Sequence, residues 1–209
     1  MGHTSTLIGG VQAGYNWQFG ASLAGIEADL QGLGRGDTGK LTTKVGPFPF
    51  FGAAEVVNTT INSAERVDYL GTLRGRLGYL ATPALLLYGT GGLAYGHVHA
   101  STSISQSNND CAQFPAQCIQ TTAATAGSLS ETRTGWTAGG GVEWMFGQNW
   151  TAKLEYLHYD LGAVTFGVGA LAYANGSFAG LGGPAVSTTL STTRLSGNII
   201  RIGLNYKLN

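Results

Sequence analysis

The sequence contains little charge. Lys, Arg, Asp and Glu together make up 11% of its 209 residues, whereas a typical soluble domain has about 25%. Hydrophobic content is an ordinary 43%, and Gly, Thr, Ser, Asn and Ala take the place of the missing charge. This composition argues against a soluble globular surface and is typical of strands that face lipid on one side and a crowded polar interior on the other. At this length we expect one all-β domain, residues 1–209.

Neither sign of charge is in excess, with 11 basic and 11 acidic residues. A protein that follows a nucleic-acid backbone needs clustered Lys and Arg, and electrostatic steering of an acidic partner needs a net positive field. Nucleic acid is therefore not an expected partner.

Long apolar runs are also missing. No window reaches the roughly 18 apolar residues that a transmembrane helix requires, and the sequence does not open with a positively charged region followed by an apolar core. The protein is therefore either soluble or crosses a membrane with strands. In the second case we expect a secretory signal upstream of this sequence.

Cysteine is nearly absent. The two cysteines, Cys111 and Cys118, are separated by six residues within a stretch rich in Ser, Asn, Gln and Thr that is typical of a loop. This local pair predicts a disulfide and an oxidising compartment, and two free thiols remain the alternative.

What the sequence does contain is alternation with a period of two, in segments of about ten residues, the length at which a tilted strand crosses a bilayer. In the last segment, for example, Leu204 and Tyr206 alternate with Asn205 and Lys207. Seven segments show the pattern, at about 7–17, 22–31, 65–80, 85–98, 134–146, 150–161 and 199–208. They predict an antiparallel up-and-down transmembrane β-barrel of the eight-stranded type.

The connections between these segments alternate in length. Those at 18–21, 81–84 and 147–149 are tight, and those at about 32–64, 99–133 and 162–198 are long and rich in Gly, Ser, Thr and Asn. Outer-membrane barrels have short periplasmic turns and long extracellular loops, so we expect the first segment to run inward from the cell surface. Single-chain bacterial barrels use an even number of strands, so we expect one more strand upstream of Met1. Without it, the open edge would close imperfectly, recruit a substitute or pair between molecules.

Charged residues fall on the parity opposite to the apolar residues and are expected to face the lumen. A ring of about eight strands is just wide enough to be filled by its own side chains, and a lone buried charge costs several kcal/mol. Five acids facing five bases therefore predict an ion-paired plug instead of a wide channel. The predicted network is Glu27, Asp29, Asp68, Arg74, Arg76, Glu143, Lys153, Glu155, Arg201 and Lys207.

Catalytic interpretations compete with this plug. Acid–base catalysis could be served by Glu27 and Asp29, or by Lys153 and Glu155, but residues two apart on a strand simply share a face. An outer-membrane lipid-modifying enzyme would need a His, a Ser and an acid at the lipid boundary, and His158 with Asp160, or His97 with His99, could supply part of it. His97 and His99 could also bind a metal together, but the sequence shows no third ligand nearby. We expect no enzymatic activity and no cofactor.

Aromatic residues gather near the ends of the predicted strands. Rings with a polar edge favour the membrane interface, so they predict a girdle; the aromatic core of a soluble sandwich is the alternative. Three tryptophans cluster at the short-turn end, which favours the girdle. The set is Tyr15, Trp17, Trp144, Phe146, Trp150, Tyr156 and Tyr206.

Several stretches resemble a known family, the small outer-membrane β-barrel proteins, often called porin-family, of the opacity-protein and OmpA-like barrel superfamily. The stretches are GGVQAGYNW (9–17), GIEAD (25–29), LRGRLGY (73–79), GGLAYG (91–96), GWTAGGGVE (135–143) and KLEY (153–156). The resemblance implies an eight-stranded barrel in the outer membrane of a Gram-negative bacterium, with a cleaved signal peptide. It also implies that this chain begins at the family's second strand.

The end of the chain resembles the signal that the barrel-assembly machinery reads in such proteins. Arg201, Gly203, Tyr206 and Leu208 match the pattern polar-x-Gly-x-x-aromatic-x-hydrophobic. Members usually finish on an aromatic residue, whereas this chain ends on Leu208 and Asn209.

Such proteins are described as envelope-stability proteins, surface antigens, adhesins or weak porins. Our leading hypothesis is a structural barrel embedded among outer-membrane lipid and lipopolysaccharide, with three long surface loops that could bind an extracellular ligand. A narrow pore for small solutes is the alternative, and a lipid-modifying enzyme is the third hypothesis.

Overall fold

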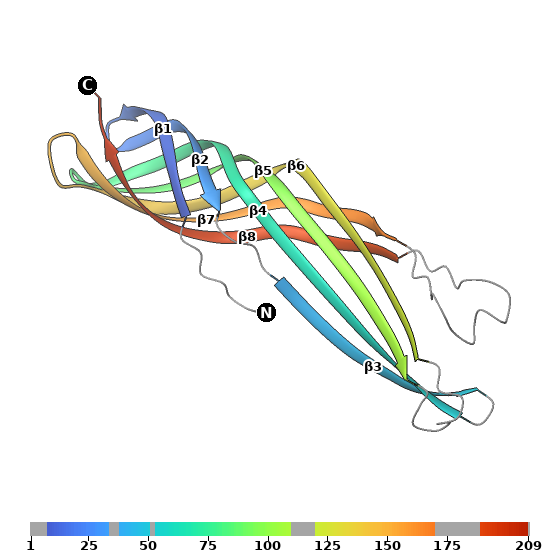
Figure 1. Ribbon diagram of the computed structural model, residues 1–209. Coiled ribbons are helices and arrows are strands. Elements are labelled where there is room, and N and C mark those ends of the chain that lie inside the picture. The colour runs from blue at the N-terminus through green and yellow to red at the C-terminus, as the bar shows by residue number, and fades with distance from the viewer. Residues whose placement is uncertain (1–7, 34–37, 51–52, 110–119, 170–188, 209) are drawn as a thin grey trace.

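The computed structural model describes residues 8–33, 38–50, 53–109, 120–169 and 189–208. These residues form one antiparallel sheet of eight strands (Figure 1). In chain order the strands are β1 (Ile8–Phe19), β2 (Ser22–Leu33), β3 (Thr38–Phe50), β4 (Ala53–Thr82), β5 (Leu85–Asn109), β6 (Gln120–Met145), β7 (Trp150–Val168) and β8 (Thr189–Tyr206). Within the described ranges, no helix has the length and apolar character needed to cross a membrane.

The strands pair in the order β1-β2-β4-β5-β6-β7-β8, and β3 pairs with β4. β2 lies beside Tyr69–Tyr79 of β4 and β3 lies beside Ala53–Ala64, both on the edge opposite to β5. β2 and β3 therefore lie end to end along one side of β4, and the sheet has seven strand positions. The predicted all-β, up-and-down architecture is confirmed, and each predicted segment falls on one of these seven positions.

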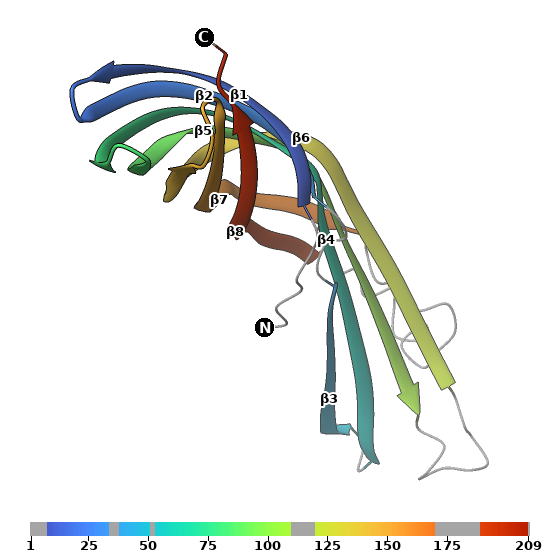
Figure 2. The same cartoon turned by 90° about the vertical axis from the view of Figure 1, so that its left-hand side faces the viewer.

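The sheet is strongly curved, and its two ends approach each other, as the two views in Figures 1 and 2 show. The Gln12 side chain of β1 donates a hydrogen bond to Asn205 of β8, although the described residues of these two strands share no backbone ladder. Side chains of β2 also reach those of β7 and β8 inside the curve. Strands at opposite ends of the pairing order thus surround a common interior.

Three tight turns join the strands at one end of the sheet, as the sequence predicted. They connect β1 to β2, β4 to β5 and β6 to β7. Gly20 has a φ of 63°, a left-handed conformation that favours glycine, and its carbonyl accepts a hydrogen bond from the Gln18 side chain at 3.0 Å. Neighbouring turns are joined by backbone bonds, such as that from the Leu80 N–H to the Ala21 carbonyl at 2.8 Å. This end of the sheet is a hydrogen-bonded rim.

The opposite end differs from the prediction. The segments 32–64, 99–133 and 162–198, expected as loops, are largely strand where the structure describes them, because β4, β5 and β6 run for 30, 25 and 26 residues. Figure 1 shows these strands and β3 extending far beyond β1 and β2. Their outer faces carry Ser, Thr and Asn, so they lack the apolar alternation of lipid-facing strands and have the composition of loops. The predicted disulfide, Cys111 to Cys118, lies outside the described residues.

The sheet consists of two halves that differ in the polarity of their outward and inward side chains. The basal half comprises β1, β2 and residues 69–82, 85–95, 136–145, 150–158 and 199–206; the distal half comprises β3 and residues 53–68, 96–109, 120–135, 159–168 and 189–198. Outward side chains of the basal half are apolar and exposed, such as Leu77 at 71% and Ile202 at 82%. Outward side chains of the distal half are mostly Ser, Thr and Asn. The distal interior is an apolar core that includes Val98, Ala100, Ile104, Ala123, Leu161, Val164, Phe166, Val168 and Leu195.

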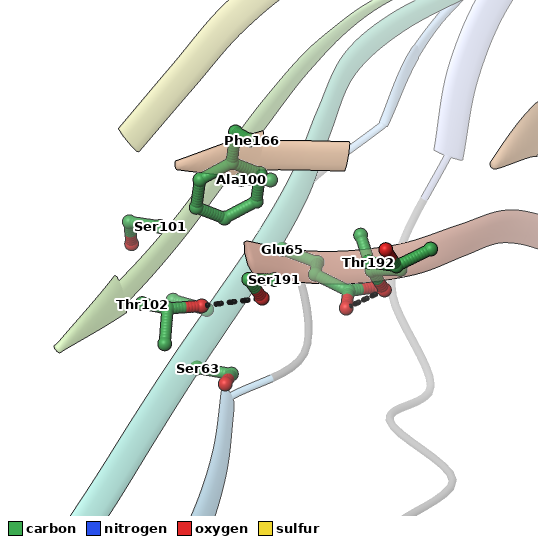
Figure 3. Close-up of a pocket in the computed structure, with 10 residues that line it drawn as sticks. Ser63, Glu65, Ala100, Ser101, Thr102, Phe166, Ser191 and Thr192 are labelled. Atoms are coloured by element: carbon green, nitrogen blue, oxygen red, sulfur yellow. Dashed lines mark hydrogen bonds between the residues drawn. The ribbon is translucent and has the colours of Figure 1, made fainter. Parts of the chain in front are cut away.

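A small cavity of about 90 Å³ lies within the distal half (Figure 3). Thr102 of β5 and Ser191 of β8 share a hydrogen bond of 3.2 Å at its wall. Glu65 of β4 accepts a hydrogen bond from Thr193 of β8, and Phe166 of β7 also lines the cavity. The distal strands therefore curve around a shared interior as the basal strands do.

Candidate functional site

Charged side chains converge inside the basal half. The register explains their pairing, because inward residues of opposite charge lie directly across from each other on neighbouring strands. Glu27 of β2 is opposite Arg74 of β4, and Glu155 of β7 is opposite Arg201 of β8. The curvature of the sheet then brings the pairs together. We call the resulting group the interior charge cluster: Glu27, Asp29, Arg74, Arg76, Glu143, Lys153, Glu155 and Arg201.

Arg74 is at the centre of the cluster, and its side chain is fully buried. One of its terminal nitrogens donates to Glu27 at 2.5 Å and to Asp29 at 2.7 Å, and the other donates to Glu155 at 3.1 Å. Thr72 donates to the same Asp29 oxygen at 2.7 Å. A single guanidinium thus links β2, β4 and β7.

Arg201 and Lys153 surround the same three carboxylates from the other side. Arg201 of β8 donates to Glu155 at 2.5 Å and to Asp29 at 3.1 Å. Lys153 of β7 donates to Glu27 of β2 at 2.9 Å. These contacts join strands from opposite ends of the sheet, so they hold the curve through side chains.

A second tier of polar contacts lies nearer the short turns. Arg76 of β4 pairs with Glu143 of β6, and Glu143 also accepts hydrogen bonds from Thr151 at 2.6 Å and from Asn205 at 3.3 Å. Asn205 accepts a further bond from Gln12 of β1. The tier therefore runs from β4 through β6, β7 and β8 to β1.

Tyr88 of β5 connects the two tiers and was missed by the sequence analysis. Its hydroxyl donates to Glu155 at 3.0 Å, and the Arg76 guanidinium lies 3.7 Å above its ring. The only available signal was its inward parity, shared with Leu86, in the segment whose alternation is weakest. Its buried ring packs against the Arg76 guanidinium and fills part of the interior.

The cluster is neutral as a whole. It contains four carboxylates, Glu27, Asp29, Glu143 and Glu155, and four cations, Arg74, Arg76, Lys153 and Arg201. Buried charges are stable only when they are paired and hydrogen-bonded. Deleting one partner leaves the remaining charges buried, without a counter-charge and without water. The cluster therefore acts as one unit that fills the interior and locks the strands.

Asp68, predicted in the interior network, lies instead on the outer face. A β-bulge between Val67 and Tyr69 shifts the register of β4 against β5. Asp68 is the extra residue, and it contacts the outward-facing His99 at 3.0 Å. The prediction was wrong because a bulge reverses the facing of every residue beyond it and leaves no mark in a period-two pattern.

The predicted residues at the end of the chain occupy different surroundings. Lys207 is exposed and follows the last residue of β8, so its predicted place in the interior is also wrong. Tyr206 and Leu208 face outward. A Cβ on Gly203 would lie 3.3 Å from side-chain carbons of Lys153, so this glycine leaves room for the buried lysine. The interpretation of these residues as a signal for the barrel-assembly machinery stays a prediction.

The aromatic residues predicted as a girdle are exposed, and most lie at the short-turn end. Tyr15 and Trp17 meet edge to face with ring centroids 5.0 Å apart. Trp150 of β7 and Tyr206 of β8 meet in the same way at 5.1 Å. The exposed set is Tyr15, Trp17, Trp144, Phe146, Trp150, Tyr156 and Tyr206. Their contact with a membrane interface stays a prediction.

His158 and Asp160, the candidate catalytic pair, are held by other partners. His158 Nδ1 lies 2.8 Å from the Asn198 side-chain oxygen. Asp160 accepts a hydrogen bond from Arg194 at 2.5 Å and from the Gly162 N–H at 2.8 Å. These two donors hold the pKa of the Asp160 carboxyl below its usual range. Both contacts tie β7 to β8 or shape the β7 bulge, which is a structural role.

An apolar outer face around a charged interior is the arrangement of a membrane barrel. In agreement, the family model described as outer membrane protein beta-barrel domain matches residues 3–207. The chain belongs to this family. It is a protein of the bacterial outer membrane, and the resemblance seen in the sequence is confirmed.

Curated relatives of this outer-membrane barrel protein carry similar descriptions. The chain is 35% identical over 202 residues to the 31 kDa outer-membrane immunogenic proteins of Brucella melitensis and Brucella suis, covering 96% of this chain and 66% of each relative. It is 32% identical over 158 residues to the 22 kDa outer membrane protein of Rhizobium leguminosarum bv. viciae, covering 76% of this chain and 54% of that protein. The matches thus span just under two thirds, or about half, of these relatives. No solved structure matches the chain.

Proposed function

We propose that the protein is a non-enzymatic structural barrel whose lumen is closed by the interior charge cluster and whose distal half presents surface loops. The burial of the cluster carries this proposal, since the side chains of Arg74, Lys153 and Glu155 are at most 1% exposed. In a water-filled pore the lining charges remain in contact with solvent. Here the charges contact one another, so the interior has the character of a plug.

The outer surface of the basal half supports its insertion in lipid. Trp136 and Trp144 are both exposed, and the segment of β6 from Trp136 to Trp144 contains nine residues. A tilted strand crosses a bilayer with about 9–11 residues. Leu77 and Leu87 are exposed between the levels of these two rings. We propose that this band contacts outer-membrane lipid and the acyl region of lipopolysaccharide. The barrel-assembly machinery is the partner expected during biogenesis.

The polar outer surface of the distal half supports a position beyond the lipid. Ser101, Ser103 and Ser105 face outward on β5, where a lipid-facing strand would carry apolar residues. β3, β5 and β7 end, and β4, β6 and β8 begin, at this end, where outer-membrane barrels carry their extracellular loops. We propose that the loops of this protein serve envelope integrity or bind a ligand at the cell surface.

Conductance across a planar lipid bilayer tests the closed lumen. The wild-type protein should show no stable open current, because charges without water access provide no continuous path for ions. Glu143→Gln removes one charge from the second tier and should increase the frequency of brief openings. Lys207→Gln is the matched control, because Lys207 is exposed outside the cluster.

A stable wild-type current on the nanosiemens scale would overturn the closed lumen and establish the narrow porin instead. Equal currents in the wild-type protein and in Glu143→Gln, both near background, would still fit the plug but would remove Glu143 from the group that keeps it shut. Hydrolysis of outer-membrane lipid that disappears in His158→Ala would contradict the non-enzymatic role.

A further inference from the structure

The bulge in β4 creates a group of metal-ligating side chains on the outer face. Asp68, the extra residue of the bulge, lies beside two histidines of β5 that share one face of that strand. Ligand atoms of Asp68, His97 and His99 all lie within 4.8 Å of one another. We propose that these three residues bind a divalent transition metal ion, with Zn²⁺ as the best fit. The site is distinct from the interior charge cluster and is independent of whether the lumen is closed.

The chemistry of the three ligands favours zinc. Zn²⁺ is commonly bound by imidazole nitrogen and carboxylate oxygen, at about 2.0–2.2 Å, and tetrahedral geometry then places neighbouring ligand atoms roughly 3.3–3.5 Å apart. The His99 Nε2 and Asp68 Oδ2 atoms are 3.0 Å apart, so they can ligate the same ion with a small adjustment. Three protein ligands leave a fourth position for water or an external ligand.

His97 is the third ligand, and neighbours on three sides hold its ring beside the pair. The rings of His97 and His99 have centroids 4.8 Å apart, and Tyr69 stacks on His97 at 6.2 Å with an interplanar angle of 12°. On β6, Ser130 lies 3.2 Å from Nε2 and Thr132 lies 3.4 Å from Nδ1. A metal ion would replace one of these two contacts, and the contact to the other, non-ligating nitrogen would orient the ring, as such contacts do in metal-binding histidines.

The site is accessible from solvent in the distal half. The Asp68 and His99 side chains are 34% and 39% exposed. On β5, His97 and His99 lie just beyond Tyr95, where the exposed apolar band ends. A metal ion there would join β4 to β5 at the point where the bulge interrupts their ladder. Arg66 competes with the ion, because its Nε atom lies 2.6 Å from Asp68 Oδ1.

Zinc titration of the full-length protein in uncharged detergent, followed by calorimetry, tests the site. After removal of metal with a chelator, the protein should bind one Zn²⁺ ion. His97→Ala, His99→Ala and Asp68→Asn should each weaken binding at least about tenfold, since even changes to residues that only orient ligands typically cost 10–100-fold. Co²⁺ in place of Zn²⁺ should give a visible absorption band that is lost in the same variants.

Arg66→Gln sharpens the test because it should tighten zinc binding by freeing Asp68 and removing a nearby positive charge. A merely structural contact of Asp68 with Arg66 and His99 predicts no such gain. His158→Ala and the pair Cys111→Ser with Cys118→Ser are controls that retain the site and should leave zinc affinity unchanged. Far-ultraviolet circular dichroism checks that each variant keeps its strands.

The proposal fails if the wild-type protein binds no zinc, or if the three ligand variants bind it as tightly as the wild type does. It also fails if the tight site disappears in either control, since the ion would then be held elsewhere. Loss of binding in the ligand variants together with a gain in Arg66→Gln supports it.

Discussion

The basal and distal halves of this barrel have opposite polarity. In the basal half, exposed leucines and isoleucines surround a cluster of four acids and four bases, six of which are buried. In the distal half, exposed serines and threonines surround buried residues such as Val98 and Phe166. The strands pass from one half to the other with inward positions remaining inward on β5 and β6. On the proposed placement in the membrane, the medium outside the sheet, and not the strand itself, decides which side carries the apolar residues.

The two halves illustrate two ways of stabilising the same curved sheet. Where the outside is water, burying apolar side chains inside is favourable at about 25 cal/mol per Å². Where the outside is lipid, the apolar side chains belong outside, and a narrow interior must then satisfy polar groups with one another. Bulges on β4 and β7 lie at the transition. Bulges are common at the rims of barrels, where they redirect side chains.

Of the substitutions that test this comparison, replacement of Arg74 should change the free energy of unfolding the most. Arg74→Ala leaves Glu27, Asp29 and Glu155 with one cation fewer in a buried site, so the free energy of unfolding should fall by about 3–5 kcal/mol. Urea unfolding in lipid vesicles, followed by tryptophan fluorescence, measures the change. Lys207→Ala should change stability by less than about 0.5 kcal/mol, because Lys207 is exposed. If both variants unfold at the same urea concentration, the basal interior is not held by its charges.

A matched pair of arginine substitutions on the outer face should have the next largest effect. Leu77→Arg places a charge near the middle of the proposed lipid band, where it should destabilise the protein by roughly 2–4 kcal/mol. Ser103→Arg places the same charge on the outer face of the distal half and should change stability by less than about 0.5 kcal/mol. The same urea titration measures both. Equal losses would show that the two outer faces meet the same medium, which the proposed boundary does not allow.

The sequence predicted the basal half well because its outward apolar and inward polar residues alternate strictly. Ile200 and Ile202 flank Arg201 in a pattern that a soluble loop has no reason to adopt, and each predicted segment became a strand. The distal strands were assigned to loops because water imposes no such pattern on their outer face. Ser101, Ser103 and Ser105 look like loop residues unless Ala100 and Ile104 are known to be buried.

The members of the interior charge cluster could be predicted only where inward and outward residues alternate along a strand without interruption. Parity assigned Arg74 and Glu155 to the lumen, where the structure places them. It failed at Asp68, because the extra residue of a bulge is visible only in the pairing of two strands. For the same reason the sequence showed two histidines without the third ligand, which comes from a different strand. Contacts between distant strands, such as Lys153 with Glu27, depend on curvature that no local pattern encodes.

The smallest expected effect on stability is that of Asp160, at the transition between the halves. Arg194 and the Gly162 N–H hold the pKa of the Asp160 carboxyl below its usual value near 3.9. A carboxyl whose pKa is lowered by folding stabilises the fold in its ionised form. That contribution is fully present above the usual pKa and is lost as the pH falls through the folded value. Asp160→Asn keeps an oxygen for the Gly162 N–H but removes the charge. The stability difference between wild type and Asp160→Asn should therefore be constant from pH 7 to about pH 5 and shrink below about pH 4. Urea unfolding across this range in uncharged detergent measures it, and a difference that persists at low pH would mean that shape, not charge, holds this bulge.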